Sequence, residues 1–166
     1  MARIFNHYVR TSPVIFSNRT LSEDDMRDKL RRLGAGSEFP FLVAEADGAL
    51  AGYAYAHLWQ PDPVYGRTWE LTIYLAPQAC GRGLGTHLLT ALVEACRRRG
   101  AHTLLSCISQ GNEPCERMHR RAGFELAGVL TGVGYKFGRY YNDAFYQLQL
   151  EDIPASVMTP TNTPTT

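Results

Sequence analysis

The segment Tyr74-Leu75-Ala76-Pro77-Gln78-Ala79-Cys80-Gly81-Arg82-Gly83-Leu84-Gly85-Thr86 joins a β-strand pattern to a helical pattern through a glycine-rich turn. In such a turn the main-chain N–H groups point outward together at the start of the helix, where they can hold a phosphate or a pyrophosphate. Glycine is needed there because a Cβ atom would block the close approach of the phosphate. Taken alone, the glycines of this segment fit a purely structural turn equally well.

Two other glycine-rich nucleotide sites are excluded by the spacing. A Walker loop ends in Gly-Lys-Ser or Gly-Lys-Thr, and no such triplet follows Gly83 or Gly85. A dinucleotide-binding loop needs G-x-G-x-x-G after the first strand of a βαβ unit, which this segment does not supply. Which phosphate-containing ligand the turn binds must therefore be inferred from motifs in the surrounding sequence.

An amphipathic helix begins in this turn. Apolar residues recur every four positions from Leu84 to Cys96, which predicts a helix with one buried face. The helix is expected to end at Gly100. The arginines at 97–99 fill its last turn, where cations compensate the negative end of the helix dipole, so they do not indicate a nucleic-acid contact.

Turn signals divide the rest of the chain into helices and strands. Ser22 and Asp25 form a variant of the capping box that opens a helix. Asp47-Gly48 separates two apolar runs and predicts a β-hairpin. The other expected elements are helices at 4–8, 22–33 and 113–121, and strands at 41–45, 50–58, 69–75, 103–108, 124–129 and 144–150. This order predicts an α/β sandwich around one sheet.

Length and composition fit one globular domain. The chain has 166 residues, of which 45% are apolar, so a single domain is expected at 1–150. Residues 151–166 are rich in Pro and Thr and predict a disordered tail. No run approaches the roughly 20 apolar residues that span a bilayer. A net charge of +1 gives no reason to expect nucleic acid or a membrane as a partner.

The cysteines and histidines show no metal-ligand pattern. The four cysteines contain no C-x-x-C pair, so we expect reduced thiols and no metal. Residues 1–7 lack the uninterrupted apolar core of a signal peptide, and the expected compartment is the cytoplasm.

Further motifs occur in a fixed order around the glycine-rich turn. They are IFNHYV at 4–9, AGYA at 51–54, ELTIYL at 70–75, NEP at 112–114, MH at 118–119, GF at 123–124 and GYKFGR at 134–139. Together with the turn they resemble the GNAT superfamily of acetyl-coenzyme A dependent N-acetyltransferases, whose signature Q/R-x-x-G-x-G/A opens the central helix. The resemblance is closest to the phosphinothricin and methionine sulfone acetyltransferase branch and runs from Ile4 to Leu150.

This resemblance implies a fold and a co-substrate. The fold would be a mixed, mainly antiparallel sheet with helices on both faces, without the first edge strand of relatives. Acetyl-coenzyme A would be the co-substrate, and the N–H groups of Tyr74 and Leu75 would contact its thioester oxygen or pantetheine arm. The implied binding residues are Ile73, Tyr74, Leu75, Cys80, Gly81, Arg82, Gly83, Leu84, Gly85, Thr86 and Asn112.

Two of these residues need comment. Cys80 stands at the Q/R position of the signature, and because main-chain donors hold most of a pyrophosphate, we expect weaker but retained binding. Asn112 can be a helix N-cap, a contact to the pantetheine arm, or both.

Glu70 and His119 are the candidate catalytic residues. A carboxylate can take a proton at neutral pH from an α-ammonium group, whose pKa is about 8. The resemblance places Glu70 at the position of this base, and the alternative is a solvent-facing strand carboxylate. His119 stands where many relatives carry a tyrosine that protonates the coenzyme A thiolate. Its alternative is a helix histidine bonded to a neighbouring backbone carbonyl.

The resemblance also implies an acceptor site. Its residues would be Gln60, Arg67, Glu70, Leu71, Thr72, Tyr135 and Phe137. Relatives often carry Arg or Lys where this chain has Gln60, so Arg67 is the expected substitute for binding a substrate carboxylate. Tyr135 to Phe137 would form a loop over the substrate, and Phe137, where some members have His, would make the pocket more apolar.

The predicted function is acetyl transfer to the α-amino group of a small amino-acid-like acceptor such as phosphinothricin, methionine sulfone or methionine sulfoximine. Transfer would be direct, because neither Cys80 nor Cys115 has the adjacent histidine of a thiolate nucleophile. Two alternatives stay open: acetylation of protein or peptide N-termini, and a coenzyme A binding module without turnover. The resemblance also favours a homodimer.

Overall fold

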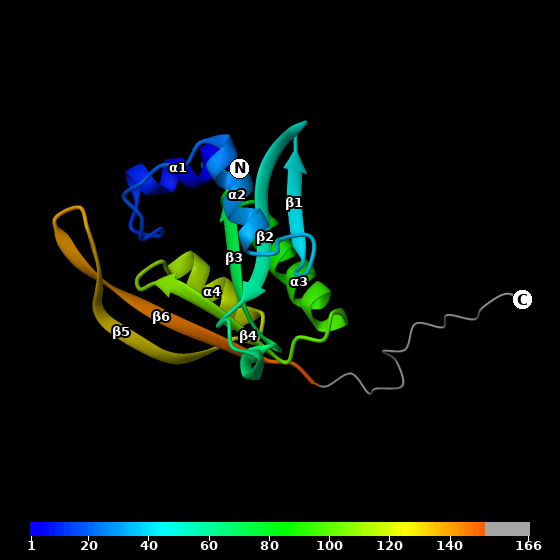
Figure 1. Cartoon of the computed structure of the whole chain (residues 1–166). Helices are drawn as coiled ribbons and strands as arrows, with labels where there is room; N and C mark the ends of the chain where they lie inside the picture. Colours follow the sequence, from blue (N-terminus) through cyan, green and yellow to red (C-terminus); the bar gives the residue numbers. More distant parts are fainter. Residues whose placement is uncertain (152–166) are drawn as a thin grey trace, which may run out of the picture.

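A mixed sheet of six strands forms the centre of the protein (Figure 1). The computed structural model describes residues 1–151. Residues 152–166 of the predicted tail lie outside the described residues. The strands lie in the order β1 (Phe41–Ala46), β2 (Ala49–Leu58), β3 (Thr68–Leu75), β4 (Thr103–Ser109), β6 (Arg139–Gln149) and β5 (Glu125–Lys136). All neighbours pair antiparallel except β3 and β4. The predicted mixed, mainly antiparallel sheet is confirmed.

Helices cover both faces of this sheet, as predicted. They are α1 (Ala2–Thr11), α2 (Glu23–Arg32), α3 (Leu84–Arg98) and α4 (Glu113–Arg121), with short 3-10 turns η1 (Pro63–Tyr65) and η2 (Pro77–Ala79). The apolar stripe of α3, including Leu89 and Leu92, is buried against Leu104 and its neighbours on one face. On the other face, Ile4 of α1 packs with Tyr53. No helix within residues 1–151 combines the length and apolar character needed to cross a membrane.

The strands β3 and β4 separate after a short paired stretch. Residues 68–70 of β3 pair with residues 103–105 of β4, and the pairing stops there. Beyond this point β3 continues beside β2 to Leu75, whereas β4 continues beside β6 to Ser109. Figure 1 shows the two strands pointing in different directions. Residues 71–75, which we call the open edge of β3, therefore have no strand partner on the side of β4.

Two local predictions are confirmed in detail. Ser22 Oγ accepts a hydrogen bond from the N–H of Asp25 at 3.0 Å, and the Asp25 carboxylate accepts one from the N–H of Ser22 at 3.0 Å. This capping box stabilises the start of α2 by about 1 kcal/mol. In the turn between β1 and β2, Asp47 and Gly48 have φ angles of +54° and +71°, as a two-residue hairpin requires.

The last two strands are longer than predicted. β5 continues to Lys136, and β6 begins at Arg139. A two-residue turn joins them, in which Phe137 and Gly138 have φ angles of +51° and +77°. The expected loop at Tyr135 is therefore wrong, since Tyr135 is part of β5. Glycines and two irregularities in the register interrupt the apolar alternation of β5, which hides the strand in the sequence.

A buried lysine ties this hairpin to the N-terminal region. Lys136 is 3% exposed, and its Nζ donates hydrogen bonds to the carbonyls of Ser12 and Ile15, both at 2.8 Å. Burial lowers the pKa of this amino group. Ser12 follows the last turn of α1, where the helix dipole favours a cation. The hairpin is thus fixed against the end of α1.

Candidate active site

The glycine-rich turn presents open main-chain groups at the start of α3. Gly81 and Gly83 have φ angles of +76° and +78°, in the left-handed region that other residues disfavour. Gly83 is the N-cap of α3 and supplies no capping side chain, so the N–H groups of the first helical turn are left for a ligand. A Cβ atom at Gly81 would meet nothing within 4 Å. The turn therefore fits a phosphate group.

Gly85 serves packing instead of backbone conformation. A Cβ atom at this position would lie 3.0 Å from Sδ of Met118 and 3.3 Å from Cδ1 of Leu75. Glycine thus lets α3 approach both β3 and α4 closely. The other members of the turn, Arg82 and Thr86, are exposed, and Arg82 forms a 3.2 Å ion pair with Asp47.

The open edge of β3 directs alternate main-chain groups toward the side of β4. The N–H of Ala76 donates to the carbonyl of Ala51 at 2.8 Å, which sets the phase of the ladder with β2. Because antiparallel pairing alternates, the main chain of Tyr74 faces β2, whereas those of Ile73 and Leu75 face the other way. Of the predicted main-chain contacts, the structure leaves the main chain of Ile73 and the N–H of Leu75 available, whereas it engages the main chain of Tyr74 in the sheet.

Tyr8 of α1, which is not among the residues predicted for the site, fixes the end of the open edge. Its Oη donates to the carbonyl of Leu75 at 2.8 Å and lies 3.7 Å from Sγ of Cys80. Burial, with a smaller contribution from Cys80, raises the pKa of Tyr8, so the phenol remains a donor. From the sequence alone, Tyr8 cannot be distinguished from an ordinary core residue of the first helix. Its partner is 67 residues away, and no local pattern reveals it.

Glu70 lies at the point where β3 and β4 separate. It is half-buried and lies opposite His57 of β2 in the β2–β3 pairing. Burial raises the pKa of its carboxyl group, the charge of Asp143 raises it further, and the charge of His57 acts in the opposite direction. A carboxylate with a raised pKa is well matched to accept a proton near neutral pH. The position and environment of Glu70 therefore suit a general base.

The other predicted acceptor residues are not all brought together. Thr72 shares the face of Glu70, whereas Leu71 is 5% exposed and packs in the core beneath α3. Nε of Arg67 donates to the carbonyl of Gly100 at 2.9 Å, which places this part of its guanidinium beside the end of α3. Gln60 is exposed in the connection between β2 and β3. The structure thus gathers Glu70 and Thr72 and directs the Leu71 side chain elsewhere.

Phe16, in the loop after α1, contacts the hairpin formed by β5 and β6. In this hairpin the predicted acceptor residues Tyr135 and Phe137 are 61% and 56% exposed. The ring of Phe16 lies so close to Gly134 that a Cβ atom on this glycine would be 2.9 Å from it. No motif marks Phe16 in the sequence, because its contact depends on the absence of a side chain at a distant position.

His119 is almost fully buried in α4, with 2% of its surface exposed. Its Nδ1 lies 2.9 Å from the carbonyl of Cys115, and because a carbonyl only accepts, Nδ1 carries the hydrogen. In the neutral ring Nε2 then has a lone pair, and this buried atom has no hydrogen-bond partner among residues 1–151. Burial lowers the pKa of His119. The carbonyl contact matches the structural alternative, while the lone pair of the buried Nε2 is left unsatisfied.

Asn112 is the N-cap of α4, but its side chain makes no capping hydrogen bond. The nearby N–H of Gly111 instead donates to the carboxylate of Glu116 at 2.9 Å. The purely local explanation for this asparagine is therefore not realised, and its amide is left for another contact.

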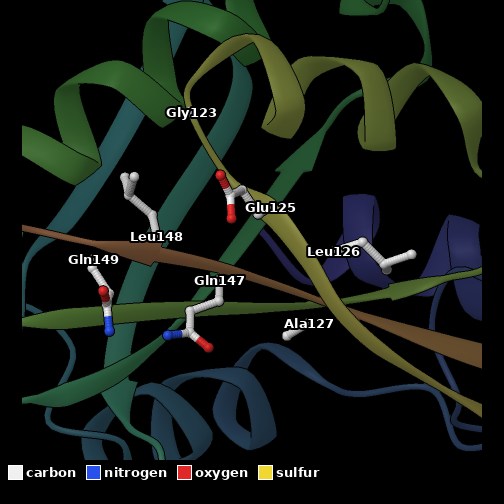
Figure 2. Close-up of a pocket in the computed structure, with 7 residues that line it drawn as sticks. All are labelled: Gly123, Glu125, Leu126, Ala127, Gln147, Leu148 and Gln149. Atoms are coloured by element: carbon white, nitrogen blue, oxygen red, sulfur yellow. The ribbon is translucent and has the colours of Figure 1, made fainter.

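A separate surface hollow lies at the beginning of β5 (Figure 2). It is lined by Gly123, Glu125, Leu126, Ala127, Gln147, Leu148 and Gln149. None of the predicted site residues belongs to this set. The candidate active site is therefore a different part of the molecule, the open edge of β3 with the glycine-rich turn.

Comparison with known proteins agrees with this geometry. The profile of the Acetyltransferase (GNAT) family matches residues 1–124. The chain is 35% identical over 152 residues to phosphinothricin N-acetyltransferase of Streptomyces viridochromogenes, covering 92% of this chain and 81% of that protein. It is 33% identical over 155 residues to the L-methionine sulfoximine/L-methionine sulfone acetyltransferase of Salmonella typhimurium, covering 92% of this chain and 88% of that protein.

A solved structure shares the whole architecture. A GNAT superfamily phosphinothricin acetyltransferase from Sinorhizobium meliloti, in complex with AcCoA, matches with a TM-score of 0.86 and 31% identity, covering 97% of this chain and 86% of that one. Residues 1–124, which the family profile matches, include the glycine-rich turn, Glu70 and His119. The chain belongs to the Acetyltransferase (GNAT) family and is an acetyl-coenzyme A dependent N-acetyltransferase, as the sequence predicts.

Proposed function

We propose that the protein acetylates the α-amino group of a small amino-acid-like acceptor of the phosphinothricin, methionine sulfone or methionine sulfoximine type, by direct attack in a ternary complex. The observation that carries this proposal is the continuity of residues 70–86, in which Glu70 is followed by the open edge and then by the glycine-rich turn. One segment thus offers a base, main-chain contacts and a phosphate site. The names of the relatives from Streptomyces viridochromogenes and Salmonella typhimurium support this acceptor class.

Main-chain groups hold the co-substrate in this proposal. Bound acetyl-coenzyme A supplies an activated thioester carbonyl. The N–H groups of residues 81–86 hold its pyrophosphate, and the main chain of Ile73 and the N–H of Leu75 hold the pantetheine arm and the thioester. The free amide of Asn112 adds a side-chain contact. Such preorganised donors strengthen as negative charge develops on the thioester oxygen.

Glu70 prepares the acceptor for attack. An ammonium group cannot attack, so the Glu70 carboxylate first removes one proton, directly or through one water. The neutral nitrogen then forms a bond to the thioester carbon while the C–S bond breaks. A second proton leaves the nitrogen and reaches the departing thiolate, with His119 as the proposed carrier. The proton on Glu70 returns to solvent, which restores the base.

We also propose a homodimer formed through the hairpin of β5 and β6. β5 is an edge strand of the sheet. The apolar side chains exposed on this hairpin are Leu126, Leu130, Val133, Tyr135, Phe137 and Tyr140. Exposed apolar edges of this kind favour association with another chain. A second copy of this chain is the partner that we propose.

The cytoplasm is the proposed compartment. All four cysteines are free thiols. Free thiols persist where the environment is reducing.

Thiol release measures the proposed reaction directly. We expect release from acetyl-coenzyme A with phosphinothricin or methionine sulfone, and none with a short peptide that has a free N-terminus. Turnover with the peptide alone would instead indicate acetylation of N-termini. Heat of binding for acetyl-coenzyme A without turnover on any acceptor would indicate a binding module.

A further inference from the structure

Glu116 of α4 joins separate segments of the protein through one carboxylate. Its Oε1 accepts a hydrogen bond from the N–H of Gly111 at 2.9 Å, and its Oε2 accepts one from the hydroxyl of Tyr146 at 2.9 Å. Arg120, one turn further along α4, donates to the same Oε2 at 3.1 Å. Gly111 lies in the connection between β4 and α4, and Tyr146 is a fully buried residue of β6. The carboxylate therefore fixes α4 and the connection before it against the sheet.

The surroundings of Glu116 keep its carboxylate ionised. The side chain is 12% exposed, so water competes little with the protein donors. The hydrogen bond from Gly111 is the largest cause that lowers the pKa of Glu116, Tyr146 and Arg120 lower it as well, and burial acts in the opposite direction. Hydrogen bonds to an ionised acceptor are about twice as strong as those between neutral groups. The charge of Glu116 thus contributes to its hold on Gly111.

Gly111 directly precedes Asn112, a half-buried residue whose side-chain amide makes no hydrogen bond within residues 1–151. The main chain of Asn112 is fixed on both sides. Its N–H donates to the carbonyl of Ser109 at 3.1 Å, and its carbonyl accepts from the N–H of Glu116 at 3.0 Å. Gly111 itself has a φ angle of +92°, and glycine has the most conformational freedom to lose when a segment is ordered. The bond from Glu116 to Gly111 therefore holds the most flexible point of this connection.

The other side of α4 lies against the glycine-rich turn. Met118 is two residues beyond Glu116, and a Cβ atom on Gly85 would lie only 3.0 Å from its Sδ. The helix is thus held at Met118 against the start of α3 and at Glu116 against β6. These two contacts set where Asn112 lies relative to the glycine-rich turn. In the proposed function the turn and the amide of Asn112 bind two parts of the same acetyl-coenzyme A molecule.

We propose that Glu116 is a positioning residue for acetyl-coenzyme A, whose carboxylate holds Gly111 and Asn112 so that the amide of Asn112 meets the pantetheine arm. This inference rests on the proposed function, in which Asn112 contacts that arm, and Glu116 acts only through Asn112. A contact residue that is ordered before the ligand arrives loses less conformational freedom on binding, so the ligand binds more tightly.

The substitution Glu116→Gln removes the charge and keeps the size of the side chain. We expect the Kd of acetyl-coenzyme A, measured by calorimetric titration without an acceptor, to rise roughly 5- to 20-fold, because the amide of Asn112 is no longer held in place. The KM for methionine sulfone at saturating acetyl-coenzyme A should stay unchanged, since no acceptor contact is altered.

Glu113→Gln is the matched control on the same helix. Glu113 pairs with Arg117 at 2.9 Å in the same four-residue spacing that joins Glu116 to Arg120. Glu113 is exposed, and its carboxylate holds no main-chain group of the connection. Loss of this ion pair should leave the Kd of acetyl-coenzyme A unchanged.

A double-mutant cycle separates positioning from a general structural role. Asn112→Ala should raise the Kd by itself, and because Asn112 makes no capping hydrogen bond, the variant removes the amide without removing a helix cap. In this background Glu116→Gln should raise the Kd by less than about twofold, since the amide that it positions is gone. With Gly81→Ala, a change in the glycine-rich turn, the effects of Glu116→Gln should multiply.

Tyr146→Phe provides a second variant if Glu116→Gln does not fold. It removes one donor to the carboxylate and keeps the charge and the buried ring. We expect a smaller rise in the Kd of acetyl-coenzyme A, and again no further rise in the Asn112→Ala background.

The contrary outcomes are distinct. Losses of Glu116→Gln and Asn112→Ala that multiply would assign Glu116 a general structural role and overturn the inference. An unchanged Kd in folded Glu116→Gln would overturn it, and so would an equal rise in Glu113→Gln or an unchanged Kd in Asn112→Ala. If the parent protein binds no acetyl-coenzyme A, the proposed function itself fails, and the role of Glu116 fails with it.

Discussion

The hydroxyl of Tyr8 in α1 donates a 2.8 Å hydrogen bond to the main-chain carbonyl of Leu75, at the end of the open edge of β3. This bond joins the first helix to the strand that leads into the glycine-rich turn. It therefore couples the N-terminal helix to the proposed site for acetyl-coenzyme A, although neither residue carries a catalytic group.

Tyr8→Phe removes this bond and little else. We expect the free energy of unfolding to fall by about 1 kcal/mol and the KM for acetyl-coenzyme A to rise roughly 3- to 10-fold, because the end of β3 is less fixed. Urea unfolding and steady-state kinetics measure the two effects. Tyr65→Phe, in the exposed η1 turn, is the control. Equal KM values for both variants would show that the bond has no part in binding.

Glu70→Gln tests the proposed base. We expect kcat to fall roughly 100- to 10,000-fold with acetyl-coenzyme A affinity nearly intact, since a carboxamide cannot accept the proton. In the parent enzyme, kcat/KM should fall as pH drops through the pKa of Glu70, which lies above the usual range of a glutamate. Glu45→Gln, an exposed change of the same kind in β1, should behave like the parent. An unchanged rate for Glu70→Gln would exclude the base.

Gly81→Ala separates backbone strain from loss of the phosphate site. Gly81 and Gly138 have φ angles of +76° and +77°, and an added Cβ atom would meet nothing within 4 Å at either position. Each alanine variant should lose about 1 to 2 kcal/mol of stability. Only Gly81→Ala should also raise the KM for acetyl-coenzyme A, because Gly81 belongs to the turn proposed to hold the pyrophosphate and Gly138 does not. Calorimetric titration that shows equal affinity in both variants would argue for a purely structural turn.

His119 should make stability depend on pH. Its folded-state pKa is lowered, so the unfolded ring binds a proton first, and the free energy of unfolding should fall as pH drops below about 6.5. His119→Phe should lose this dependence. Urea unfolding at pH 7.5 and pH 5.5 measures the difference for both proteins, and equal differences would contradict the buried neutral ring.

The kinetics of the same variant test the proton carrier. His119→Phe should lower kcat, because the neutral ring can no longer take the second proton from the nitrogen and pass it to the thiolate. A variant that matches the parent at every pH would leave His119 with a structural role.

Leu130→Glu tests the proposed dimer. Leu130 in β5 is 50% exposed, and a buried carboxylate at an interface is costly. Light scattering should give twice the chain mass of 18.5 kDa for the parent and the chain mass for the variant. Val43→Glu, 50% exposed on the opposite edge strand β1, should leave the dimer intact. Loss of the dimer in the Val43 variant alone would move the interface to β1.

Local patterns in the sequence were sufficient for the elements around α3. The four-residue spacing from Leu84 places the helix, and the Ser22 capping box and the Asp47-Gly48 turn define their own neighbourhoods. These signals work because each depends on residues only a few positions apart, whose geometry is set by helix and turn periods. The order of the resulting motifs also identified the family.

Only the tertiary structure decided how distant residues meet at the site. It shows where β3 leaves β4, that Tyr8 holds Leu75, and that Glu116 binds the hydroxyl of Tyr146. It also shows that a two-residue turn containing Phe137 joins β5 to β6. These features depend on strand register and on packing between segments far apart in the chain. A pattern with a period of a few residues carries no information about them.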